Sequence, residues 1–379
     1  MKGYDLIIVT SNPYPNGLAS TNRIATYAKE IAQFCNVLLL SFADSPFVAG
    51  GDKYHKGCID KVDYIYLRPA DPKNKTVLTK IAYRVITVLR LLYFLLIKYS
   101  PRSIICYFDS IFYTRCIYFI SKLRKCHIYR DVTETFEVYF GSEKNRNRQK
   151  NIQRLYDGLI VMTEGIRDYF VGINNNTFVL PMGVDVSRFD NISSRDEKYF
   201  FYCSGGVLER DGVIDSLKGF LAFHKQYPEY TFRMATPIDN NDDYHNSVMK
   251  LVKENPCIEY LGVVDSKNIP ILMSKSTGLV VTPHHDYITK GFPTKLGEYM
   301  ASRKPVVCTS IATLKDNIPE DCCYMASPNN IEEIANAMKR IIENPLEASR
   351  IAQNGYNYVI KNYTVRPYLN DLLIFLQLA

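Results

Sequence analysis

The sequence predicts two α/β domains, each built around a doubly wound parallel sheet. Three observations support this prediction: the length of 379 residues, a series of short apolar runs, and the helical stretches that separate these runs. A chain of this length usually exceeds what one hydrophobic core serves, so two domains are expected. The runs are continuous rather than alternating, as strands of a parallel sheet covered on both faces should be.

The first domain is predicted over residues 1–189. Its apolar runs alternate with helical patterns such as TNRIATYAKEIAQFC at 21–35, in which apolar residues recur at helical spacing. This alternation predicts a parallel sheet with helical crossovers. The expected strands cover residues 4–10, 36–42, 63–69, 103–109, 126–132 and 158–164.

The same pattern begins again after residue 198 and predicts a second domain over residues 190–360. The junction FVLPMGVDVSRFDNISSRDEK is rich in Pro, Gly, Ser and charge, which is typical of a linker, and we place the boundary at Phe189. The expected strands of this domain are 198–205, 231–236, 258–264, 277–283, 304–310 and 322–327.

Composition and cysteine usage indicate an ordinary folded protein. Hydrophobic residues make up 47% of the chain and charged residues 22%. The ten cysteines are scattered without a C-x-x-C pair, which favours reduced core thiols over a zinc site or a disulfide framework. Asp5 precedes a short N-terminal apolar run with no cleavage site after it, so this run is interpreted as a first strand rather than a signal peptide. We expect a cytoplasmic protein.

The positive charge of the chain is concentrated in its first half. The net charge is +7, and residues 1–190 hold 26 Lys and Arg against 17 Asp and Glu. Such asymmetry indicates a polyanionic partner or an anionic membrane surface. No nucleic-acid-binding module is present in the sequence, so nucleic acid is not expected as a partner.

Residues 77–100 form the most hydrophobic stretch, VLTKIAYRVITVLRLLYFLLIKYS. Arg84 and Arg90 lie inside it, which argues against a membrane span. Two interpretations remain open. The stretch is either a core helix of the first domain or a helix in peripheral contact with an anionic bilayer. In the second case the residues expected to face lipid are Tyr83, Leu91, Leu92, Tyr93, Phe94 and Leu95.

The segment 283–310 carries the strongest functional signal. It follows an expected strand, passes through a loop with Gly291 and starts a helix near Thr294. The unpaired N–H groups of such a helix N-terminus suit a phosphate, and Lys295 adds a point charge. Glu298, one turn into the helix, either accepts hydrogen bonds from ribose hydroxyls or is a surface glutamate that favours the helix dipole.

The sequence GFPTKLGEYMASRKPVV at 291–307 resembles the donor-site signature of glycosyltransferase family four, the large retaining GT-B family. The resemblance implies two Rossmann-like domains that face a cleft and a donor that is a UDP- or GDP-linked sugar. It assigns Glu298 to the ribose of the nucleotide. Lys290 stands where the family often has a glutamate that contacts the sugar, so the donor sugar stays open. The donor-binding candidates of this segment are Lys290, Gly291, Phe292, Pro293, Thr294, Lys295 and Glu298.

Two further segments extend the resemblance. LPMGVDVSRF at 180–189 is similar to the family's interdomain segment, and YCSGGVLERDGVIDSLKGF at 202–220 is similar to its glycine-containing loop. The family's Arg and Lys, which bind the donor diphosphate, are replaced here by Val207 and Asp211. Gly206 and Arg210 are donor-binding candidates in this loop, with Arg210 or Lys295 as the replacement cation. The alternative is that the glycines only make a tight turn.

The resemblance also implies candidates in the first domain. Gly17 lies where the family has a loop that faces donor phosphate and acceptor, although Pro-Asn-Gly is also an ordinary turn. Asp131 and Glu134 match an acidic pair that contacts the acceptor or the leaving sugar, and they are the catalytic candidates. The alternative for Asp131 is a helix cap. Residues 361–379 resemble the C-terminal helix that returns to the N-terminal domain in GT-B proteins.

The sequence therefore predicts a retaining glycosyltransferase that moves a sugar from a nucleotide-sugar to a glycan or lipid-linked acceptor, in the synthesis of a surface polysaccharide such as capsule or the O-antigen of lipopolysaccharide. No D-x-D sequence is present, so no metal cofactor is expected, and His284, His285 and Asp286 are not expected to form a metal site. Two alternatives remain: a GT-B epimerase that acts on a nucleotide-sugar, and a scaffold that binds a nucleotide-sugar without turnover.

Overall fold

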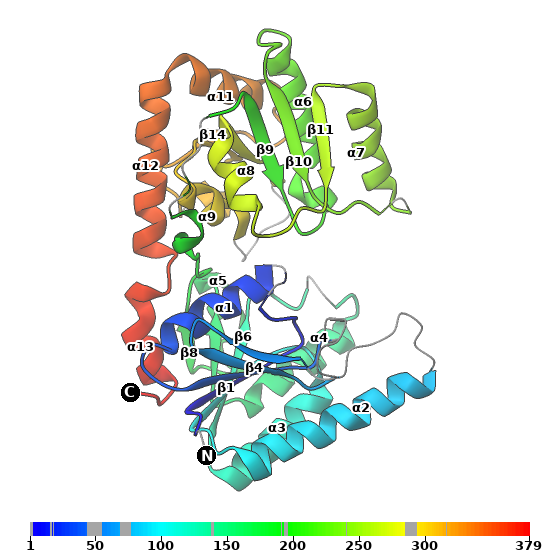
Figure 1. Ribbon diagram of the computed structural model, residues 1–379, viewed down its shortest axis with the longest axis vertical. Coiled ribbons are helices and arrows are strands. Elements are labelled where there is room, and N and C mark those ends of the chain that lie inside the picture. The colour runs from blue at the N-terminus through cyan, green and yellow to red at the C-terminus, as the bar shows by residue number, and fades with distance from the viewer. Residues whose placement is uncertain are drawn as a thin grey trace. The chain divides into compact units, whose positions relative to one another are not determined.

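The computed structural model describes residues 3–15, 17, 19–43, 55–68, 77–137, 140–190, 192, 196–239, 241–284, 294–315 and 317–379. The chain forms two compact units. Unit 1 comprises Met1–Gly183 and Val365–Ala379, and unit 2 comprises Val184–Thr364 (Figure 1). The divisions fall after Gly183 and Thr364, whereas the sequence pattern puts them after Phe189 and residue 360.

Unit 1 contains an eight-stranded sheet with the order β3-β4-β2-β1-β5-β6-β7-β8. Neighbouring strands are parallel except for the antiparallel pair β3 and β4. The strands are β1 (Leu6–Thr10), β2 (Val37–Ser41), β3 (Lys56–Ile59), β4 (Val62–Tyr66), β5 (Ser103–Tyr107), β6 (His127–Val132), β7 (Gly158–Val161) and β8 (Thr177–Val179). The helical elements are α1 (Ala19–Ile31), α2 (Val77–Leu92), η1 (Tyr93–Lys98), α3 (Ile111–Arg124), α4 (Glu143–Ile152), η2 (Gln153–Leu155), α5 (Glu164–Tyr169), η6 (Arg366–Tyr368) and α13 (Leu369–Phe375).

The C-terminal segment is part of the core of unit 1. Leu372 and Leu376 pack in the same buried cluster as Ile24 and Tyr27 of α1. The ring centroid of Phe375 lies 5.1 Å from the ring centroid of Tyr129 in β6. The last residues of the chain therefore cover a sheet whose strands lie at the beginning of the sequence.

Unit 2 contains a six-stranded parallel sheet with the order β11-β10-β9-β12-β13-β14. Its strands are β9 (Tyr199–Cys203), β10 (Thr231–Ala235), β11 (Ile258–Gly262), β12 (Gly278–Val281), β13 (Val306–Thr309) and β14 (Tyr324–Ala326). The helical elements are η3 (Val186–Phe189), η4 (Glu209–Asp211), α6 (Val213–His224), α7 (Asp243–Glu254), α8 (Ile269–Lys275), α9 (Thr294–Ala301), α10 (Ala312–Lys315), α11 (Ile331–Glu343) and α12 (Pro345–Asn362).

The strands that the sequence predicts are all present, and the prediction of two doubly wound α/β units is confirmed. The central strands β1, β2 and β9 are buried along their whole length, which explains their continuous apolar runs. The prediction missed β3 and β8, which form the two edges of the first sheet and are not buried. An exposed edge strand needs no apolar run and so leaves little signal in the sequence.

Two further expectations can be compared with the structure. All ten cysteines are free thiols. Six of them are buried, as expected for core thiols, whereas Cys35, Cys116 and Cys257 are half-buried and Cys58 is exposed. Among the described residues, no helix is both long and apolar enough to cross a bilayer.

Candidate functional site

The candidate site lies at the carboxyl edge of the sheet of unit 2, between β9 and β12. The two strands are hydrogen-bonded neighbours, and the strand order runs in opposite directions on either side of them. In open α/β sheets, ligands bind at this switch point because the loops after the two central strands diverge there. The loop after β9 contains the glycine pair, and the segment after β12 leads to α9.

Helix α9 is anchored to the end of β9 by Tyr299. The Tyr299 hydroxyl accepts a hydrogen bond from the Cys203 backbone N–H at 2.8 Å and donates one to the Cys203 carbonyl at 3.1 Å. Leu296 and Met300 on the same helix are fully buried. The apolar face of α9 therefore holds its first turn at the switch point. The preceding candidates lie outside the described residues, namely Lys290, Gly291, Phe292 and Pro293 together with His285 and Asp286.

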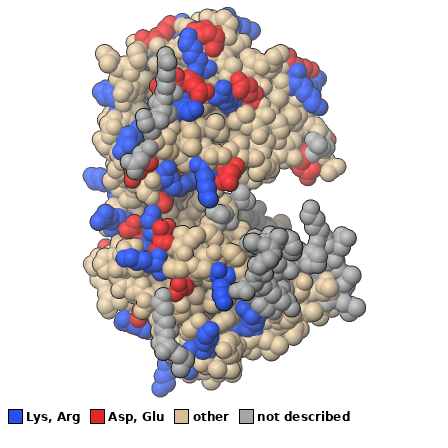
Figure 2. All heavy atoms as spheres, in the orientation of Figure 1, with Lys and Arg blue, Asp and Glu red and all other residues tan. Residues whose placement is uncertain are grey.

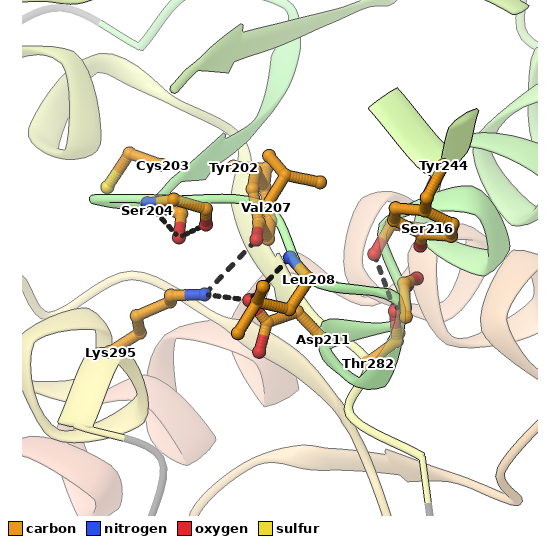
Figure 3. Close-up of polar contacts among 12 residues, drawn as sticks. Tyr202, Cys203, Ser204, Val207, Leu208, Asp211, Ser216, Tyr244, Thr282 and Lys295 are labelled. Atoms are coloured by element: carbon orange, nitrogen blue, oxygen red, sulfur yellow. Dashed lines mark hydrogen bonds and ion pairs between the residues drawn. The ribbon is translucent and has the colours of Figure 1, made fainter. Parts of the chain in front are cut away.

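Thr294 begins α9, and Lys295 points from this first turn toward the loop after β9 (Figure 3). The Lys295 ammonium donates a hydrogen bond to the Tyr202 hydroxyl at 3.1 Å and lies 3.4 Å from Asp211 Oδ2. Burial alone would lower the pKa of Lys295, but Tyr202 and Asp211 outweigh it and hold this pKa above its ordinary value. Lys295 is therefore a charged group at neutral pH.

Asp211 is the acidic residue of the glycine-containing loop that Lys295 contacts. Lys295 reaches Asp211 from a different element, and the carboxylate partly neutralises its ammonium. Lys295 is one of the two replacement cations that the sequence suggested. Arg210 is half-buried, and its carbonyl accepts a hydrogen bond from the His284 N–H at 3.0 Å.

Gly212 fastens the start of α6 to the end of β12. Its φ of +66° is in the left-handed region, and a Cβ at this position would stand 1.7 Å from the carbonyl oxygen of Thr282. The Thr282 hydroxyl donates to the Gly212 carbonyl at 2.7 Å and lies 2.6 Å from the Ser216 hydroxyl (Figure 3). The two loops of the site are therefore locked together by a close approach that only glycine permits.

Hydrogen bonds with the side chains of Ser204 and His245 hold the glycine-containing loop after β9. The Ser204 hydroxyl accepts from the Gly206 N–H at 3.3 Å. His245 accepts from the Asp239 N–H through Nδ1 at 2.8 Å, which leaves Nε2 as the nitrogen that donates to the Val207 carbonyl at 2.6 Å. A Cβ at Gly206 would meet no atom of the described residues within 4 Å, in contrast to one at Gly212.

Glu298 is paired with Arg188 from the segment that enters unit 2. Arg188 Nη1 lies 2.7 Å from Glu298 Oε1, and Nη2 donates to the Ser266 carbonyl at 3.3 Å. Both side chains are about one-quarter exposed, so a ligand can approach the carboxylate. Cys203 lies nearby. Burial, aided by the Glu298 charge, raises the pKa of Cys203 to about 12, so this thiol stays protonated and is not a nucleophile.

In unit 1, Asp131 forms a buried ion pair with Arg23. Arg23 Nε lies 3.0 Å from Asp131 Oδ2, and the side chain of Asp131 has an exposed fraction of 0%. Arg23 also donates to the carbonyls of Leu180 and Pro181. It therefore connects α1 and β6 to the end of the first of the two chain segments that form unit 1. Asp131 caps no helix, because it lies within β6. The ion pair gives Asp131 a structural role, and its part in acceptor chemistry stays a prediction.

The other two candidates of unit 1 have different surroundings. A Cβ on Gly17 would stand 2.1 Å from the Thr21 hydroxyl oxygen, so the turn before α1 requires a glycine for packing. Glu134 is half-buried, and its Oε2 has no hydrogen-bond partner among the described residues. An enclosed carboxylate oxygen of this kind is costly unless a ligand or proton satisfies it.

No metal site is formed by the described part of the chain, in which no three His, Cys, Asp or Glu side chains gather. His284 lies 3.7 Å from Asp215 Oδ2, as a two-residue contact at the N-terminus of α6.

Comparison with known proteins identifies the region that carries this site. Residues 186–358 match the family described as Glycosyl transferases group 1. The match covers most of unit 2 and less than half of the chain. A curated relative, MMP alpha-(1->4)-mannosyltransferase from Mycolicibacterium hassiacum, is 19% identical over 188 residues. That match covers 49% of this chain and 44% of the relative, so the chain matches less than half of the relative's length.

Solved structures resemble the chain over nearly its whole length. Sucrose-phosphate synthase from Thermosynechococcus elongatus has a TM-score of 0.71 at 15% identity and covers 98% of both chains. HepE from Anabaena, in complex with UDP and glucose, has a TM-score of 0.71 at 14% identity and covers 99% of both chains. At these identities the likeness shows the fold, and the chain has the two-domain GT-B fold.

Within unit 2, the structure brings together Lys295, Asp211 and the glycine-containing loop, all singled out by the sequence. It adds Arg188, Tyr202 and His245, which sequence reasoning missed. Tyr202 lies in an apolar strand, His245 is a lone histidine on a helix, and Arg188 belongs to a polar junction. None of these patterns indicates that its side chain contacts the site.

Proposed function

We propose that the chain is a retaining glycosyltransferase that moves a sugar from a nucleotide-sugar to a glycan or lipid-linked acceptor. The observation that carries the proposal is the pair Lys295 and Glu298, which stand one turn apart at the start of α9 on the switch point of a group 1 unit. Lys295 and the helix N-terminus would hold the diphosphate, and Glu298 would accept hydrogen bonds from the ribose.

The proposed chemistry relies on alignment and charge stabilisation. As the sugar leaves, negative charge grows on the diphosphate, and the Lys295 ammonium with the N–H groups of α9 would stabilise it. Arg188 would orient the Glu298 carboxylate through their ion pair. No metal ion is required by this scheme, and we expect transfer to continue in the presence of EDTA.

We assign the acceptor to unit 1, with Glu134 near the reacting hydroxyl. Its Oε2, which has no hydrogen-bond partner in the described part of the chain, supports this choice, whereas Asp131 is already paired with Arg23. A carboxylate there could accept the hydroxyl proton or support a cationic sugar. The acceptor class that we favour is a growing surface polysaccharide, such as capsule or O-antigen, assembled on the cytoplasmic side of a membrane.

A UDP-sugar is our preferred donor, since HepE is a structure of the same fold in complex with UDP and glucose. The first test is a thermal-shift screen of the full chain against UDP-, GDP- and ADP-sugars and their free nucleotides. A ligand at about 100 times its Kd stabilises by about 2.7 kcal/mol. We expect a selective shift with UDP ligands that is lost in Glu298→Ala and in Glu298→Gln.

The matched control for this screen is Glu332→Ala, which removes an exposed glutamate from the first turn of α11 and should keep the full ligand shift. Each variant is compared with its own ligand-free melting temperature, because loss of Glu298 also unpairs Arg188. A selective shift without any sugar transfer would favour the scaffold, and conversion of the nucleotide-sugar without an acceptor would favour the epimerase.

The contact between Lys295 and Asp211 leads to a second prediction, in which replacing the two residues changes the Kd for UDP in opposite directions. Lys295→Met should raise the Kd for UDP about tenfold, because one charge-assisted contact to the diphosphate is lost. Asp211→Asn should lower this Kd by up to about fivefold, because the ammonium is no longer partly neutralised. Isothermal titration calorimetry measures both constants. Equal Kd values in wild type and both variants would remove Lys295 from the diphosphate site.

A further inference from the structure

Helix α2 and the turn η1 that continues it expose one row of apolar side chains. The row repeats every four residues, so its members are neighbours on one helical face. Leu89 is 60% exposed and Ile97 is 76% exposed. The complete row is Ile81, Val85, Leu89, Tyr93 and Ile97.

The opposite side of the same helix is buried in unit 1. Leu91, Phe94 and Leu95 are among its core residues. These three positions follow the core-helix interpretation, and the lipid-facing set of the membrane interpretation is wrong for them, because the most apolar part of the stretch packs inward. The stretch is therefore both a core helix and an amphipathic surface helix, with a different residue set facing outward.

Helix α3 also exposes large apolar side chains. It packs against η1, and the two helices lie at the same end of unit 1 (Figure 1). Its exposed large side chains are Phe112, Phe119 and Leu123, and the exposed Arg115 and Lys122 lie between them in the sequence. We call these three side chains and the five of the α2–η1 row the apolar face.

Basic residues greatly outnumber acidic residues around the apolar face. Residues 77–130 contain ten Lys or Arg and a single acidic residue, Asp109, which is paired with Arg130 at 2.6 Å. Lys and Arg side chains lie over the lower part of unit 1 in Figure 2. The exposed cations of this region are Arg84, Lys98, Arg102, Arg115, Lys122 and Lys125.

We propose that the apolar face docks on an anionic lipid bilayer. Aliphatic and aromatic side chains would insert at the level of the headgroups, while the flanking Lys and Arg pair with anionic lipids. Scattered exposed apolar residues are normal, but the exposed apolar side chains of two packed helical elements, with cations around them, mark an interaction surface. The proposal does not depend on the proposed sugar transfer, although it would bring unit 1 to a lipid-linked acceptor.

Vesicle flotation of the full chain tests the proposal. We expect binding to vesicles of phosphatidylcholine with phosphatidylglycerol, weak binding to pure phosphatidylcholine, and release as the salt concentration rises. The variant Leu89→Ser/Ile97→Ser should lower the partition coefficient about tenfold. Arg84→Gln and Lys98→Gln should each lower it about fivefold for the anionic vesicles only.

The matched control is Leu346→Ser, which removes an 88% exposed leucine from α12 and should leave flotation unchanged. Equal flotation with neutral and anionic vesicles, or no flotation at all, would overturn the proposal. So would a dimer in light scattering that Leu89→Ser/Ile97→Ser dissociates without any vesicle binding, since the apolar face would then join two copies of the chain. Flotation measures no sugar transfer, so its failure leaves the proposed function standing.

A fluorescent probe gives an independent measure of insertion. The chain has no tryptophan, so Tyr93→Trp places a single reporter within the α2–η1 row. We expect its emission to shift to shorter wavelength when anionic vesicles are added, because the indole leaves water. The control Leu346→Trp should show no shift. Unchanged Tyr93→Trp emission in vesicles that bind the protein would place the contact on another surface.

Discussion

Replacing Asp131 by alanine is expected to lower the free energy of unfolding of unit 1 by about 3–5 kcal/mol, because the change leaves the buried Arg23 guanidinium without its counter-ion. Arg23 is 5% exposed and cannot recover water without local unfolding. Urea denaturation of the full chain, followed by circular dichroism, measures the loss. Arg23→Met should lower the free energy of unfolding by a similar amount, because it leaves the buried Asp131 carboxylate without its counter-ion.

Two controls separate the buried pair from an ordinary ion pair. Glu164→Ala, which removes an exposed partner of Arg167 in the same unit, should cost less than about 1 kcal/mol. The double variant Arg23→Met/Asp131→Leu should recover much of the loss, since apolar residues of similar volume can replace a buried ion pair. If Asp131→Asn kept wild-type stability and lost turnover, the role in acceptor chemistry that the sequence suggested would be correct instead.

Replacing Gly212 by alanine is expected to lower the free energy of unfolding of unit 2 by about 3 kcal/mol or more. The left-handed conformation costs a non-glycine residue about 1–2 kcal/mol, and the clash with the Thr282 carbonyl adds about 1–3 kcal/mol as an overpacked contact. Because the clash separates the loops after β9 and β12, binding of the nucleotide should weaken as well. Denaturation and calorimetry with UDP measure the two effects.

Gly206→Ala is the matched control, since this glycine lies in the same loop and an added Cβ would meet no atom of the described residues within 4 Å. It should change the free energy of unfolding by less than about 1 kcal/mol. Equal losses in the two variants would mean that the loop is sensitive to any side chain, and the argument from the contact between Gly212 and Thr282 would fail.

The fold was predictable because its signal is local. Parallel strands such as β1 and β9 are buried on both faces, so they need continuous apolar runs, and the helices between them carry a helical period. The edge strands β3 and β8 were not predicted because they are not buried and therefore need no apolar run. The segment 77–100 was ambiguous because hydrophobic side chains lie on both of its faces, and periodicity does not tell which face meets the core.

The site was predictable only in part. Lys295 and Glu298 could be named because they stand in a recognisable segment at the start of a helix. The pairing of Lys295 with Asp211 could not, because the two residues are 84 positions apart and meet only when β9 and β12 become neighbours. The same holds for Arg188 and Glu298, which are 110 positions apart.

The sequence by itself determined that the chain has two doubly wound α/β units, and it located the segment that carries the candidate donor site. Tertiary structure alone decided that Asp131 is a buried partner of Arg23, that Lys295 supplies the cation beside position 211, and that the outward face of α2 and η1 is the row from Ile81 to Ile97. The physical reason is that secondary structure and burial follow local periodicity, whereas the pairing of charges and the exposure of a helical face depend on which distant elements the fold brings together.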